Sequence, residues 1–159
     1  MSNEQNLVND LVSTNSKINP NPLTIISSSV STKTYCDLEF NGTIPSTTNK
    51  IDFCLEVKSD KSSSKFNNFL LTFGDVLKNR KIVASKNSSY GFLLEYHVND
   101  GMDSFFIKQI QNYIDSKDWD AFGTMYGCDY IFFYDDAVHE LYYAKWAGFV
   151  NASTIHKWF

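Results

Sequence analysis

Two neighbouring segments of this chain alternate apolar and polar residues, and this alternation constrains the fold more than any other feature. The segments run from Thr34 to Phe40 and from Lys50 to Lys58. A period of two residues is typical of a strand that buries one face, so both segments are predicted to be half-buried strands. Asn41-Gly42 provides turn chemistry between them. The two strands are therefore predicted to form an antiparallel pair.

The rest of the chain alternates helical and strand patterns. Helices are predicted at residues 3–14, 65–79, 103–114 and 119–125, strands at 23–26, 81–85, 90–98, 130–134 and 140–145, and a last turn or helix at Trp158. This order predicts an α/β (α+β) fold with a mixed central β-sheet flanked by helices. A chain of 159 residues is predicted to be one domain, with residues 1–32 as an N-terminal helix and loop and residues 33–159 as the sheet core.

Composition excludes some classes of protein. The net charge of −4 is unlike that of a protein that coats nucleic acid through its phosphates. No apolar run approaches the roughly 20 residues of a membrane span, and the N-terminus lacks the pattern of a signal peptide. A cytoplasmic protein without a membrane partner is therefore expected. The three cysteines form no CxxC pair and are expected to be reduced.

Asp37, Glu56 and Lys58 are the candidate catalytic residues. Glu56 and Lys58 are two positions apart on one predicted strand, so their side chains share a face. Asp37 lies in the preceding strand, where its carboxylate can approach that of Glu56. Paired carboxylates are ligands that Mg²⁺ prefers, and a nearby lysine can orient a water molecule and offset developing phosphate charge. These residue types are suited to metal-dependent hydrolysis of phosphodiester bonds.

The pattern Asp37…Glu56-Val57-Lys58, on consecutive strands after an N-terminal helix, resembles the PD-(D/E)xK nuclease superfamily. The resemblance covers roughly residues 3–80 and implies a restriction-endonuclease-like core. It implies that Asp37 and Glu56 bind Mg²⁺ or Mn²⁺ and that Lys58 is the catalytic lysine. It also implies a nucleic-acid substrate, cleaved as an endonuclease or exonuclease, and a homodimer or a separate protein partner.

Three further acids compete for the metal-binding role. Asp52 shares a strand face with Glu56, and Glu39 shares one with Asp37. Glu4, on the first predicted helix, matches an acid that some members of the superfamily carry there. These alternatives remain open on the sequence alone.

Basic residues outnumber acidic ones between Lys50 and Lys86, which predicts a locally basic face on an acidic domain. The predicted phosphate contacts come from this stretch and are Lys61, Lys65, Arg80 and Lys81.

The alternative function is that of a non-catalytic interaction protein, such as an inhibitor, an accessory factor or a nucleic-acid mimic. It would use the acidic, aromatic stretch from Asp100 to Glu140. The nuclease hypothesis requires Asp37 and Glu56 to converge beside Lys58, whereas the alternative does not. The histidines, among them His97, have no cysteine, histidine or acid at zinc-ligand spacing and are not expected to bind metal.

Overall fold

The computed structural model describes residues 2–30, 36–61, 65–82, 88–151 and 154–159, with only the backbone described for part of the second helix. Within these residues the strands form one seven-stranded sheet whose spatial order follows the sequence. The strands are β1 (Leu23–Ser27), β2 (Leu38–Thr43), β3 (Lys50–Lys58), β4 (Ser88–Glu95), β5 (Tyr130–Asp135), β6 (Glu140–Lys145) and β7 (His156–Lys157). The helices are α1 (Asn3–Ser16), α2 (Lys65–Ile82), α3 (Phe105–Tyr113) and α4 (Ser116–Tyr126), with short 3₁₀ turns at Gly101–Asp103 and Phe149–Asn151.

The sheet is mixed, as the sequence predicts. Strands β1 to β3 form an antiparallel meander, β3, β4 and β5 are parallel, and β5 to β7 are antiparallel again. Helix α2 connects β3 to β4, and α3 and α4 connect β4 to β5. Parallel neighbours need such crossover connections because the chain must return to the same end of the sheet.

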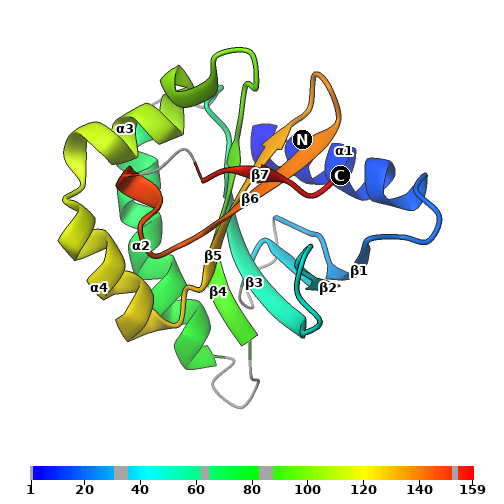
Figure 1. Cartoon of the computed structure of the whole chain (residues 1–159), viewed down its shortest axis with the longest axis horizontal. Helices are drawn as coiled ribbons and strands as arrows, with labels where there is room; N and C mark the ends of the chain where they lie inside the picture. Colours follow the sequence, from blue (N-terminus) through cyan, green and yellow to red (C-terminus); the bar gives the residue numbers. More distant parts are fainter. Residues whose placement is uncertain (1, 31–35, 62–64, 83–87, 152–153) are drawn as a thin grey trace.

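Helices cover both faces of the sheet (Figure 1). Helices α2, α3 and α4 lie on one face and enclose a core that includes Phe92, Phe106 and Trp119. Helix α1 lies on the other face, where Leu7 and Leu11 pack over a second core. Since side chains alternate along each strand, one sheet contributes to both cores.

The sheet is strongly curled. The rings of Phe40 in β2 and Phe132 in β5 have centroids 5.6 Å apart, although two strands separate them. On a flat sheet such strands would lie about 14 Å apart. The ring of Trp158, after β7, packs against both phenylalanines and completes this inner face.

Several predicted boundaries were wrong. Asn41-Gly42 is not a turn but lies within β2. A Cβ atom on Gly42 would lie 2.9 Å from the ring of Trp158, so the glycine permits close packing rather than a turn. Lys81 belongs to α2, not to a strand, and residues 83–85 of that predicted strand lie outside the described residues.

The predicted last turn or helix is also wrong, because the chain forms β7 there. Tyr142 and Tyr143 pair with it, and the backbone N–H of Trp158 donates to the carbonyl of Leu141 at 2.7 Å. The backbone groups at the edge of β6 thus hydrogen-bond to residues 156–158, and this pairing makes β7 a strand.

Among the described residues, every helix is too short or too polar to cross a bilayer.

Candidate functional site

Asp37 and Glu56 converge beside Lys58 on the face of the sheet that α2 covers. Asp37 directly precedes β2, and its backbone N–H donates to the carbonyl of Leu55 at 3.1 Å. Its Oδ2 accepts from the backbone N–H of Val57 at 3.0 Å. The carboxyl groups of Asp37 and Glu56 are in hydrogen-bond contact, and the charge of Lys58 acts on Asp37. Pairing of β2 with β3 therefore brings Asp37 beside Glu56 and Lys58, from which it lies far away in the sequence.

This site is partly desolvated. Only 6% of Glu56 is exposed, whereas Asp37 and Lys58 are half-buried. Burial raises the pKa of the Asp37 carboxyl above its usual range, and the charge of Asp75 on α2 adds to the rise. The Val57 N–H, Glu56 and Lys58 act in the opposite direction but do not outweigh burial. Two adjacent carboxyl groups in such a place require a proton or a cation between them.

The competing acids take different positions. Asp52 lies four residues before Glu56 on β3, about 13 Å along the strand, and accepts from the side-chain amide of Asn41. Glu4 is in the first turn of α1, which packs on the opposite face from Glu56.

Glu39 is buried on the same face as Glu56, with 2% of its surface exposed. It pairs across the strands with Cys54, whose Sγ lies 2.6 Å from that of Cys36. The hydrogen bond to Cys54 and burial raise the pKa of the Cys36 thiol, and the charges of Glu39 and Glu56 add to this effect. Both cysteines are free thiols, as expected, and Glu39 adds a buried acid beside them on this face.

The predicted phosphate contacts fall in two groups. Lys61 is half-exposed, but its Nζ lies 3.5 Å from Glu95 and 3.4 Å from Asp136, so acids already surround its charge. Lys65, Arg80 and Lys81 lie in α2, and their side chains are outside the part of the chain that the structure describes.

A second group of candidate metal ligands lies at the ends of the parallel strands. Asp60 follows β3, Glu95 ends β4, and His97 follows two residues later. One ligand atom from each lies within 4.8 Å of the others. Burial raises the pKa of Glu95 to about 7, and the nearby Asp60 adds to the rise. Burial lowers the pKa of His97, but Asp60 and Glu95 outweigh it and raise that pKa.

His97 therefore has two acidic partners, which its spacing in the sequence did not indicate. Its partners are 37 residues away at Asp60 and two residues away at Glu95, and neither distance is a zinc-ligand spacing. The feature that could have indicated this group is the order of the strands in the sheet. Polar residues that directly follow adjacent parallel strands meet at one edge of the sheet, where α/β folds place their ligand sites.

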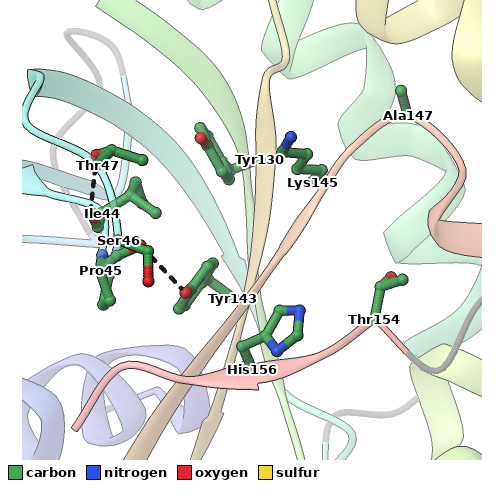
Figure 2. Close-up of a pocket in the computed structure, with 10 residues that line it drawn as sticks. All are labelled: Ile44, Pro45, Ser46, Thr47, Tyr130, Tyr143, Lys145, Ala147, Thr154 and His156. Atoms are coloured by element: carbon green, nitrogen blue, oxygen red, sulfur yellow. Dashed lines mark hydrogen bonds between the residues drawn. The ribbon is translucent and has the colours of Figure 1, made fainter.

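A cavity of about 430 Å³ opens at the other end of the sheet (Figure 2). It lies between the loop at Pro45 and the strands that carry Tyr130, Tyr143 and His156. The hydroxyl of Tyr143 donates to the carbonyl of Pro45 at 3.5 Å across it. The described residues of its lining include no carboxylate, and Lys145 contributes a positive charge. The cavity offers aromatic and hydroxyl contacts but no set of metal ligands.

The acidic stretch does not present its tryptophan to a partner. Trp119 stacks on Trp146 with ring centroids 3.8 Å apart, and each is 1% exposed. Each indole N–H donates to the backbone carbonyl of the other residue at 2.7 Å. Both rings belong to the core.

Comparison of the chain with protein-family models, with curated proteins and with solved structures found no match in any of the three.

Proposed function

We propose that this chain is a metal-dependent nuclease that hydrolyses phosphodiester bonds of DNA or RNA. The observation that carries the proposal is the hydrogen-bond contact between the Asp37 and Glu56 carboxyl groups beside Lys58. Helix α1 is followed in the chain by the meander of β1 to β3, and this meander supports the three residues. Such an order is consistent with the proposed restriction-endonuclease-like core.

The proposed metal ligands suit Mg²⁺ or Mn²⁺. Both are carboxylates, the donors that hard divalent cations prefer. Two carboxylates and one lysine carry a net charge of about −1 when ionised, so a divalent cation would compensate them while leaving positive charge for a phosphate. A bound divalent ion supplies a polarised phosphate oxygen and a water of lowered pKa.

The residues of the chain divide the remaining work. The Val57 N–H fixes the Asp37 carboxylate, so that it faces Glu56 without reorganisation. Glu56 is on β3, which is paired on both sides and is therefore a rigid support. Lys58, on the same face, orients the attacking water by hydrogen bonding and offsets the negative charge that develops on the phosphate.

The test is cleavage of plasmid, linear and single-stranded DNA and of RNA, with Mg²⁺, with Mn²⁺ and with EDTA. The variants Asp37→Asn, Glu56→Gln and Lys58→Met nearly keep side-chain volume and remove the proposed chemistry. Each is expected to lower the metal-dependent rate by about 100-fold or more. The matched controls are Asp52→Asn, an acid on the same strand, and Lys50→Met, a lysine at its other end. Both are expected to cut like the wild type.

Cleavage that persists in all three site variants would reject the assignment of residues. If the wild type cuts none of these substrates with either metal, the nuclease proposal fails and the interaction-protein alternative gains support.

A further inference from the structure

We infer that Asp60, Glu95 and His97 form a binding site for one divalent transition-metal ion of the Zn²⁺ class, separate from the proposed nuclease centre. Three groups from two adjacent parallel strands and the segments that follow them meet there. His97 Nε2 lies 2.6 Å from Asp60 Oδ2 and 3.3 Å from Glu95 Oε2. Ligand atoms about 2.0 Å from a tetrahedral ion lie about 3.3 Å from one another, so the His97–Glu95 distance already suits an ion, and the His97–Asp60 contact must open by about 0.7 Å to admit one.

A buried carboxylate oxygen with no well-formed hydrogen bond among the described residues points into this group. The Glu95 side chain is 1% exposed. Its Oε1 accepts from the hydroxyl of Ser59 at 2.7 Å. Its Oε2 makes no hydrogen bond of good geometry among the described residues and has only ion-pair contacts, with His97 Nε2 at 3.3 Å and Lys61 Nζ at 3.5 Å. An ion held between Glu95, Asp60 and His97 would give this buried oxygen a direct ligand bond, whereas exposed carboxylates on a surface are already hydrated.

The site is supported by a surrounding network. Ser59 fixes one oxygen of Glu95 and so directs the other toward His97. The backbone N–H of His97 donates to Ser104 Oγ at 2.9 Å. The next N–H, of Val98, donates to the buried Asp135 at 2.8 Å. Such supporting hydrogen bonds hold ligands in place before the metal arrives.

The donor set selects the class of ion. One imidazole nitrogen with two carboxylates suits Zn²⁺ and its neighbours in the transition series better than Mg²⁺, which prefers oxygen alone. Three protein ligands leave a position for water. The set also differs from Asp37 and Glu56 in placement. Glu56 lies on the face covered by α2, whereas Glu95 directly follows Leu94 of that face and points the opposite way.

The ammonium group of Lys61 now provides part of the positive charge that a bound ion would bring to these carboxylates. Its Nζ lies 3.5 Å from Oε2 of Glu95, and its side chain is 55% exposed. It can therefore swing into solvent at little cost when an ion binds. Its removal by Lys61→Met should tighten binding, because a competing cation is lost.

The experiment titrates Zn²⁺ into chelator-treated protein and follows binding by calorimetry. A second titration uses Co²⁺, whose visible absorption reports the ligands around the ion. The background is Asp37→Asn/Glu56→Gln, so that the readout is independent of nuclease activity and of that centre. We expect one equivalent bound, about 10- to 100-fold weaker binding in His97→Gln and in Asp60→Asn, and tighter binding in Lys61→Met. His139→Gln is the matched control, because His139 also contacts an aspartate, Asp10, at 2.8 Å but has no third ligand among the described residues.

Unchanged Zn²⁺ affinity in folded His97→Gln and Asp60→Asn would overturn the inference. So would binding that disappears only in Cys54→Ser, since the thiols of Cys36 and Cys54 are the other soft donors in close contact. A wild-type chain that binds no Zn²⁺ at millimolar concentration would also reject it. Near-ultraviolet circular dichroism verifies that each variant is folded.

Discussion

Gly123 shows how one missing side chain shapes the core. It lies in α4 against the indole of Trp146, and a Cβ atom there would lie 2.2 Å from Trp146 Cδ1. That indole cannot retreat, because it is stacked on Trp119 and hydrogen-bonded to its carbonyl. A glycine in a helix interior costs about 1 kcal/mol relative to alanine, and here the close approach of the tryptophan offsets that cost.

The first prediction compares two helical glycines. Gly123→Ala should lower the free energy of unfolding by about 2–3 kcal/mol, because the added methyl group overpacks the tryptophan pair. Gly74→Ala should raise it by about 0.5–1 kcal/mol, since a Cβ at this exposed position of α2 meets nothing within 4 Å. Urea denaturation measures both. Equal effects of the two substitutions would show that helix propensity, not the contact with Trp146, decides the outcome.

At the scale of elements, α1 is tied to β1 by one buried side chain. Asn15 is 5% exposed and lies in the last turns of α1. Its side-chain amide donates to the carbonyl of Leu23 at 2.9 Å, and its Oδ1 accepts from the N–H of Leu23 at 2.8 Å. The backbone N–H and carbonyl of Leu23, in the edge strand β1, thus bond to a side chain of α1 instead of to another strand.

The second prediction follows from this tie. Asn15→Ala should lower the free energy of unfolding by about 2–3 kcal/mol, because it leaves two buried backbone groups without this partner. Asn6→Ala, at an exposed position of the same helix, should change it by less than about 0.5 kcal/mol. Hydrogen exchange should also show faster exchange at the Leu23 amide in Asn15→Ala. Unchanged protection there would contradict the tie.

The pattern of apolar residues predicted the helices and strands whose periodicity is strong and whose ends are set by neighbouring residues in the sequence. The hairpin of β5 and β6 is confirmed almost to the residue. The long helix is confirmed from its start at Lys65, although it continues to Ile82. The pattern failed where contact with a residue distant in the sequence decides the secondary structure. Residues 156–157 become a strand only because the edge of β6 is open to them, and Gly42 lies in a strand because Trp158 packs on it.

The same distinction applies to the two sites. Asp37, Glu56 and Lys58 were predictable because they lie in consecutive strands whose pairing follows from sequence order. Asp60, Glu95 and His97 were missed because their meeting depends on parallel pairing of β3 with β4 across the α2 crossover. Nothing in the alternation of either strand specifies that register in advance.

At the scale of the whole molecule, one curled sheet separates two cores. Leu11 of α1 belongs to the core on one face, and the Trp119–Trp146 pair belongs to the core on the other. The strands contribute side chains to both, as Leu93 and Leu94 do on β4. Loss of either core would therefore expose one face of every central strand. The two layers should unfold together and not in sequence.

The third prediction tests this coupling. Leu11→Ala removes a fully buried side chain and should lower the free energy of unfolding by about 2–4 kcal/mol. If the sheet couples the layers, the near-ultraviolet dichroism of the Trp119–Trp146 pair will shift to lower urea concentration together with the far-ultraviolet signal. Leu71→Ala, on the 73% exposed side chain of a residue in α2, should leave both transitions unchanged within about 0.5 kcal/mol. A tryptophan transition that stays in place while the far-ultraviolet signal shifts would mean that the two layers unfold independently.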